Sequence, residues 1–218
     1  MNKIKILKEV EKKVRQKMDG EGTGHDWWHI DRVRKNALEI AKKEKADTFV
    51  VELGALLHDI ADFKFHNGNE SIGPKTAEKI LKSAGANSDI IEKIKHIVEN
   101  VSFKGAGIIN KIKTLEGKVV QDADRLDAIG AIGIARAFAY GGWKQRPVYN
   151  PDGRVKKHKT PKEYIKHFAD STVHHFYEKL LLLKDRMNTK TGKKLALHRH
   201  RFIENYLKHF FKEWNGKK

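Results

Sequence analysis

Apolar residues recur every three or four positions along most of this chain, which is the spacing of one face of an α-helix. Segments with this spacing cover residues 3–18, about 25–45, 75–84 and 88–101. The β-branched residues fall within the same helical periods, and no segment reads convincingly as a strand. The pattern predicts an all-α protein.

Polar side chains interrupt the strongly apolar segment 53–62, which reads LGALLHDIAD. His58 and Asp62 are four residues apart on a helix, and Asp59 and Asp62 are three apart, so all three are expected on one side. A buried carboxylate beside an imidazole must be paired or must hold a metal. We therefore expect either a core His–Asp pair or a metal site here.

A second apolar segment, residues 119–140, contains three aspartates. We expect Asp122 to cap a helix and Asp127 to pair with Arg125. Residues 141–160 follow as a basic, turn-rich loop, which is either a surface excursion or a lid over substrate. One helix is expected over residues 160–185 and another from 188 or 189 to 214. Residues 1–218 are expected to form one domain, with a core of about 1–140, the loop 141–160 and C-terminal helices over 161–215.

Composition narrows the class of protein. With 39% hydrophobic and 33% charged residues, the chain is typical of soluble globular proteins, and its apolar runs are too short to cross a bilayer. The charged N-terminal segment does not resemble a signal peptide. The absence of cysteine excludes disulfides and thiolate metal sites and favours the cytoplasm. The net charge of +17 (45 − 28) would attract polyanions, although scattered surface lysines explain much of it equally well.

Three segments together carry a resemblance to a known family: HDWWHIDRV, ALLHDIAD and VVQDADRLDAIG. In this order they resemble the HD superfamily of metal-dependent phosphohydrolases, which implies an all-α helical bundle. The resemblance assigns one divalent metal ion to four ligands, which are His29, His58, Asp59 and Asp124. Beyond Tyr140 the chain is similar only to a narrower bacterial branch of nucleotide-hydrolysing HD proteins.

The implied site defines the expected chemistry. Two imidazoles and two carboxylates suit Mn²⁺, which we favour, as well as Mg²⁺, Fe²⁺, Co²⁺ and Zn²⁺. Such an ion acidifies bound water and polarises a phosphorus–oxygen bond. By resemblance, Asp62 orients or deprotonates the attacking water. The candidate substrate-binding residues, which are cations and one histidine, are Arg32, Lys64, Lys104, Arg125, His175 and Lys179.

The sequence therefore predicts a metal-dependent phosphohydrolase acting on a nucleotide or a related phosphorylated small molecule. The narrower resemblance favours a nucleoside triphosphate pyrophosphohydrolase, and a 5′-nucleotidase-like phosphomonoesterase is the nearest alternative. A non-enzymatic HD module that binds nucleotides or nucleic acid is the alternative from another class. Nucleic acid is not favoured, because no predicted helix shows a dense basic and aromatic face. No membrane partner is expected, and the oligomeric state is left open.

Overall fold

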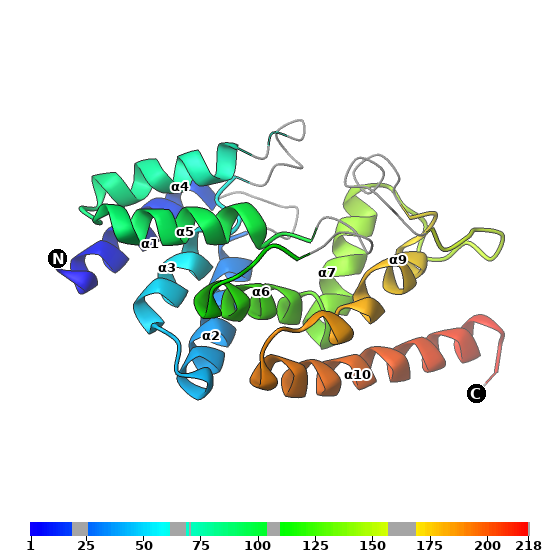
Figure 1. Cartoon of the computed structure of the whole chain (residues 1–218). Coiled ribbons are helices and arrows are strands. Elements are labelled where there is room, and N and C mark those ends of the chain that lie inside the picture. The colour runs from blue at the N-terminus through cyan, green and yellow to red at the C-terminus, as the bar shows by residue number, and fades with distance from the viewer. Residues whose placement is uncertain (19–25, 62–68, 70, 104–109, 157–168, 218) are drawn as a thin grey trace.

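A computed structural model describes residues 1–18, 26–61, 69, 71–103, 110–156 and 169–217. Every regular element within these ranges is helical, which confirms the predicted all-α class (Figure 1). The elements are α1 (Lys3–Met18), α2 (Trp27–Glu44), α3 (Thr48–Leu57), α4 (Ile72–Ser83), α5 (Ser88–Asn100), α6 (Leu115–Asp127), α7 (Gly130–Trp143), α9 (Thr172–Glu178), η2 (Leu180–Leu182), η3 (Lys184–Arg186) and α10 (Lys190–Trp214).

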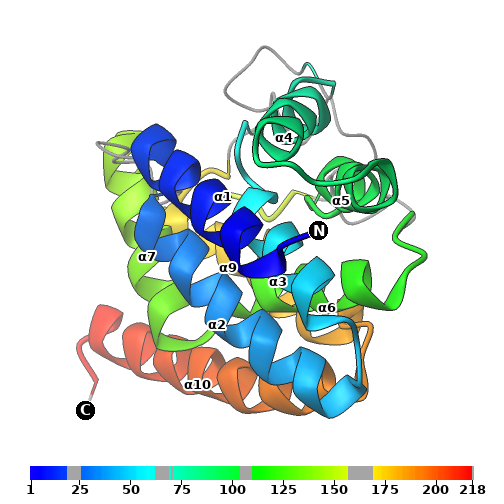
Figure 2. The same cartoon turned by 90° about the vertical axis from the view of Figure 1, so that its left-hand side faces the viewer.

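The central packing unit consists of α2, α3 and α6, each of which contacts the other two. The pair α4 and α5 packs on one side of this unit, and α1 lies against α3. On the opposite side, α10 crosses the ends of α6, α7 and α2, and both views place it along the lower edge of the molecule (Figures 1 and 2). The four predicted ligands thus come from the helices that are packed most deeply.

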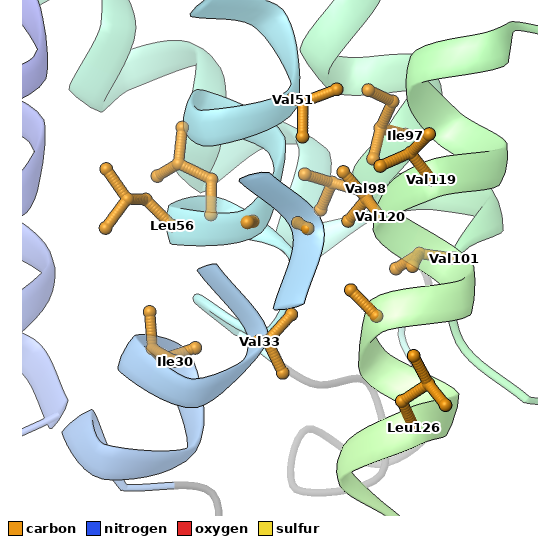
Figure 3. Packing of buried hydrophobic residues seen from close by; sticks show 14 of the residues in the cluster. Ile30, Val33, Val51, Leu56, Ile97, Val98, Val101, Val119, Val120 and Leu126 are labelled. Carbon is orange, nitrogen blue, oxygen red and sulfur yellow. The ribbon is translucent and has the colours of Figure 1, made fainter. Parts of the chain in front are cut away.

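The core is built from aliphatic side chains that interlock between α2, α3, α5 and α6 (Figure 3). α3 is apolar on nearly all of its surface, which is the character of a helix surrounded by protein. Gly54 allows this close packing: a Cβ there would lie 3.1 Å from Val120 and 3.2 Å from Ile97. A larger residue at Gly54 would push α3 away from α5 and α6.

Polar caps fix where the helices begin. Asp26 accepts a hydrogen bond from the His29 amide at 2.9 Å, and Asp47 accepts one from the Phe49 amide at 2.9 Å. Thr189 caps α10 through the Gly192 amide, also at 2.9 Å. Each cap satisfies an amide that has no partner within its own helix. The expected starts of α2, at about residue 25, and of α10, at residue 188 or 189, agree with these caps.

Two expected helices are wrong in extent. α3 ends at Leu57, so His58 and Asp59 lie in the turn that follows rather than on a continuing helix. His58 Nδ1 donates to the Ala55 carbonyl at 2.8 Å, and Ile60 N donates to the Leu57 carbonyl at 3.2 Å. If the helix continued, both carbonyls would accept from backbone amides further along the chain, so these two bonds end it.

The expected long helix over residues 160–185 is also wrong. Its described part consists of the short helix α9 and two 3-10 turns. Ser171 caps α9 through the His174 amide at 3.2 Å, which starts a new helix in the middle of the expected one. Its earlier part, residues 160–168, lies outside the described residues.

The described part of the basic loop, residues 144–156, is tied to α9 and α10. Thr172 N donates to Pro147 O at 2.9 Å, and Lys156 N donates to Glu178 at 2.9 Å. The Tyr149 ring lies 5.0 Å from that of Trp214 and 5.3 Å from that of Phe211. Residues 141–143 of the predicted loop belong to α7 instead, residues 157–160 lie outside the described residues, and the role of the loop as a lid stays a prediction.

Glycine is required where α6 meets α7. Gly130 has φ +77, and a Cβ there would lie 3.1 Å from the side chain of Arg199 on α10. Both the backbone angle and the close approach favour glycine.

Among the described helices, none has both the length and the apolar character needed to span a bilayer.

Candidate metal centre

The four predicted ligands come from the three helices of the central unit. α2 supplies His29, α6 supplies Asp124, and the turn after α3 supplies His58 and Asp59. His29 is fully buried, His58 is 3% exposed and Asp59 is 8% exposed, whereas the Asp124 side chain remains 26% exposed. The site is therefore enclosed by the bundle and open to solvent on the Asp124 side.

The predicted ligand atoms lie close together around the point where the two imidazoles face each other. His29 Nε2 lies 3.1 Å from His58 Nε2, and these two atoms cluster with a carboxylate oxygen of Asp59. The Asp59 oxygen is 3.5 Å from His29 Nε2 and 3.7 Å from His58 Nε2. An Asp124 oxygen is 3.6 and 3.8 Å from the same two atoms. Neighbouring ligand atoms on one ion at about 2.1 Å are separated by about 3.0–3.4 Å, so His29, His58 and Asp59 form the tighter group, and Asp124 would have to move closer to share the ion.

The other nitrogen of each imidazole is already engaged. His58 Nδ1 lies 2.8 Å from the Ala55 carbonyl, which can only accept, so Nδ1 carries the hydrogen. His29 Nδ1 lies 2.7 Å from the Asp127 carboxylate, which also accepts. In the neutral rings both Nε2 atoms then carry lone pairs. Two lone pairs facing each other at 3.1 Å repel unless a proton or a metal ion lies between them.

The charges around His29 favour a cation. Burial and the nearby Arg136 lower the pKa of His29, but hydrogen bonding and attraction to Asp127 and Asp59 outweigh them, so the pKa is raised. The same carboxylates that hold a proton on the ring would hold a divalent ion more strongly. The donor set contains nitrogen and oxygen and no sulfur, which suits the metals expected from the sequence.

Asp127 connects His29 to two arginines. Besides His29, its carboxylate accepts from Arg32 Nε at 2.7 Å, from Arg32 Nη2 at 3.0 Å and from Arg136 Nη1 at 2.9 Å. Burial alone would raise the pKa of Asp127, but the hydrogen bonds from His29 and Arg32 and the charge of Arg136 lower it well below its usual range. The expected Asp127–Arg125 pair is wrong. Asp127 instead holds the imidazole of His29, a predicted metal ligand, and carboxylates commonly orient ligand histidines in this way.

Asp122 and Arg125 both hold α6 to the C-terminal part of the chain. The Asp122 carboxylate accepts from the amides of Asn188 and Thr189, both at 2.8 Å, and from the Thr189 hydroxyl at 2.8 Å. The expected capping role of Asp122 is wrong: Asp122 lies inside α6, Thr114 caps α6 and Thr189 caps α10, so Asp122 instead binds the two residues that precede α10. Arg125 donates to the Arg186 carbonyl, and burial lowers its pKa to about 10.

The predicted substrate-binding residues that the structure describes do not form one group. Arg32 is bound to Asp127, so it supports His29 in this structure. Lys179 lies 5.4 Å from the centre of the Phe103 ring, and Arg186 lies 5.5 Å from it. His175 is half-buried on α9. Asp62, Lys64 and Lys104 lie outside the described residues.

Three functional candidates were missed from the sequence: Asp127 as the partner of His29, Arg136 and Arg186. Asp127 could have been suspected, because it follows Asp124 by three residues on one helix and so shares its face. Arg136 and Arg186 come from segments that the three motifs do not include. Only the folded chain places Arg136 on Asp127 and Arg186 beside Phe103 and Arg125.

The HD domain family model matches residues 27–129, which include all four predicted ligands. A Bacillus subtilis protein is 36% identical over 217 residues, covering 99% of this chain and 97% of its own. The chain therefore belongs to the HD-domain family, within the HD-superfamily hydrolases.

That relative is YpgQ of Bacillus subtilis, described as an uncharacterized protein. Its crystal structure in complex with ADP has a TM-score of 0.77 at 36% identity and covers 98% of this chain and 97% of that one. An HD-superfamily hydrolase from Bacillus thuringiensis has a TM-score of 0.76 at 39% identity, with 99% and 100% covered. A crystal structure from Lactobacillus plantarum has a TM-score of 0.86 at 35% identity, with 97% and 98% covered.

Proposed function

We propose that this protein is a metal-dependent phosphohydrolase that acts on nucleotides. One observation carries the proposal: two buried imidazoles face each other through Nε2 at 3.1 Å, with their other nitrogens held and two carboxylates alongside. A purely structural His–Asp pair would need only one imidazole and one carboxylate. This cluster is suited to an ion, and the opening at Asp124 gives a substrate access to it.

The metal would be held by His29, His58, Asp59 and Asp124. When bound, a divalent ion would supply an acidified water and a Lewis acid for the phosphorus–oxygen bond. The protein's own contribution is to hold both histidines in the Nδ1–H form, so that each Nε2 would present its lone pair to the ion. Asp62, proposed from the resemblance, would accept the proton of the attacking water.

A nucleotide is supported as the substrate by the relative and by the nearby cations. YpgQ has been crystallised with ADP, which shows nucleotide binding in a protein of the same family and length. In this chain, the Arg186 carbonyl accepts a hydrogen bond from Arg125, the residue that follows Asp124 on α6. We infer that Arg186 and Lys179 face the phosphates, with Phe103 between them. His175, Lys64 and Lys104 stay predicted substrate-binding residues.

We favour release of pyrophosphate from a nucleoside triphosphate over removal of a single phosphate. A triphosphate carries more negative charge than a monophosphate, and two cations, Lys179 and Arg186, lie within 5.4 and 5.5 Å of the centre of the Phe103 ring. A cytoplasmic location is part of the same proposal, because nucleotide pools are found there. Mn²⁺ is the favoured metal, and the substrate base and sugar stay open.

A nucleotide screen tests the proposal directly. Purified protein would be incubated with nucleoside mono-, di- and triphosphates and Mn²⁺, with phosphate and pyrophosphate measured separately. We expect turnover of triphosphates with pyrophosphate as product, and no turnover by His58→Ala. Phosphate release from monophosphates would favour the 5′-nucleotidase alternative. Turnover that persists in the His58→Ala variant would contradict the metal site.

A further inference from the structure

The positive charge of this protein is not explained by the candidate metal centre. On several helices, surface lysines are neutralised by an acidic residue one turn away. Lys35 lies 2.6 Å from Asp31, Lys82 lies 2.7 Å from Glu78, and Lys93 lies 2.8 Å from Asp89. Such pairs make a helix surface nearly neutral. The outer face of α10 differs from this pattern.

Four exposed cations form one row along α10: Lys194, Arg201, Lys208 and Lys212. Their spacings of seven, seven and four residues return to nearly the same side of a helix, within about 40°. The row is about 27 Å long at 1.5 Å per residue. None of the four forms an ion pair with a carboxylate in the described part of the chain. The row is therefore a straight line of free positive charge.

A second row, made of exposed flat rings, lies beside these cations. His198, Phe202 and His209 occupy neighbouring angles on the same helix, about 40–120° from the cation row. Phe202 is 50% exposed, so its ring is available at the surface for contact with a base. Flat rings beside a line of cations are what successive bases and phosphates of one nucleic-acid strand require.

The acidic residues of α10 do not interrupt either row. Glu204 lies on the opposite flank of the cations and pairs with His200 at 3.2 Å. Glu213 lies beyond the last ring, at the end of the helix. Towards the protein, α10 uses Ala196, Ile203 and Leu207 in the core. An interfacial membrane helix would need those apolar side chains for the lipid, so the arrangement favours a polynucleotide over a bilayer.

We propose that the outer face of α10 binds single-stranded nucleic acid, with phosphates on the cation row and bases on the ring row. The helix lies along one edge of the molecule in both views (Figures 1 and 2), which leaves this face accessible. From the sequence alone, this basic and aromatic face of α10 was not expected, because buried and exposed residues alternate along the sequence of the helix. The burial pattern separates them into distinct sides.

The binding experiment measures fluorescence anisotropy of a labelled mixed-sequence DNA strand of about 16 nucleotides, a length within the range of single-strand sites. The test variant replaces Lys194, Arg201, Lys208 and Lys212 with Gln. The matched control replaces Lys5, Lys8, Lys12 and Lys17 of α1, which are also exposed and carry the same total charge. We expect the α10 variant to lose about tenfold or more in affinity, and its salt slope to fall by about 3. The α1 control should keep the affinity and the salt slope of the unmodified protein.

A second variant tests the ring row. Phe202→Ala removes an exposed ring without changing charge, so folding should be unaffected. We expect its affinity for the single strand to fall about fivefold or more, with the salt slope unchanged. Binding to a duplex of the same length should be weaker and insensitive to this substitution.

Several outcomes would overturn the proposal. These are no binding at 0.1 M salt, equal losses in the α1 and α10 variants, or no effect of Phe202→Ala. Binding to phosphatidylserine vesicles that exceeds binding to DNA would assign the face to membranes instead. The Asp124→Asn variant should bind DNA normally while losing metal, so this proposal and the proposed enzymatic function fail or succeed separately.

Discussion

His29 and His58 face each other through their Nε2 atoms at 3.1 Å, while the Nδ1 atom of each ring is bound to a different acceptor. Both rings are buried, so neither can turn away to relieve the repulsion between the lone pairs. A positive charge between them resolves the conflict. The position of that charge, together with Asp59 and Asp124, defines where the metal should bind.

Removing one ligand should therefore remove the metal. We expect His58→Ala and Asp59→Ala to lower bound metal from about one ion per chain to nearly none, because the remaining ligands cannot enclose it. Metal content after dialysis, measured by elemental analysis, checks this. His209→Ala and Asp89→Asn are matched controls at exposed positions and should bind one ion. Full metal content in the His58 variant would place the site elsewhere.

The support of His29 by Asp127 should be measurable in metal affinity. Asp127→Asn keeps the shape but loses the charge that polarises the imidazole, so metal affinity should fall by about 10- to 100-fold. Competition with a chelating dye gives the dissociation constant. Arg136→Lys should preserve more affinity than Arg136→Gln, since Lys keeps the positive charge next to Asp127. Equal affinity in all variants would show that this network serves folding alone.

The stability of the metal-free protein should depend on pH in a defined way. The pKa of folded His29 is raised above 6.5, so its proton stabilises the fold below about pH 6.5 and this contribution is lost as pH rises through the raised value. The pKa of folded Asp127 is lowered below 3.8, so its contribution is present above about pH 3.8 and lost as pH falls.

Thermal unfolding between pH 5 and 9 tests this, with a chelator or with excess Mn²⁺. The melting temperature should decline at alkaline pH in chelator and much less in Mn²⁺, because the ion replaces the proton. His29→Gln should lack the chelator-specific decline. The same decline with and without metal would contradict the assignment.

Asp122 should matter for stability more than for metal binding. Asp122→Asn turns an acceptor into a partial donor facing the Asn188 and Thr189 amides, which costs about 1–3 kcal/mol for buried unpaired groups. Urea unfolding measures this loss. Gly192→Ala should have a similar effect, since a Cβ would lie 2.3 Å from the Asp122 carboxylate. Folded Asp122→Asn should still bind one metal ion.

The role of Asp62 rests on the family resemblance and can be tested by turnover. Asp62→Asn removes a proton acceptor and keeps nearly the same shape, so kcat should fall by about 10²- to 10⁴-fold while metal stays bound. Steady-state kinetics with the best nucleotide of the screen measure this. An unchanged kcat would remove Asp62 from the chemistry.

The sequence predicted the all-α fold and most helix starts, because helical periodicity and caps such as Asp26 are local signals. It failed where the structure depends on contacts far along the chain. Asp127 was assigned to the nearby Arg125, whereas its partners are 98, 95 and 9 residues away. The end of α3 was missed because the His58 ring takes a helix carbonyl, which periodicity does not register.

The bonds that hold α6 have a consequence for protein engineering. The family match ends at residue 129, but several groups that bind α6 lie beyond it. They are Arg136, the Arg186 carbonyl, Asn188, Thr189 and Arg199. A fragment cut at residue 129 would leave the Asp122 carboxylate without any of its amide and hydroxyl donors. We infer that a fragment ending at residue 129, although it contains all three sequence motifs, does not fold on its own. A minimal metal-binding fragment must extend at least into α10.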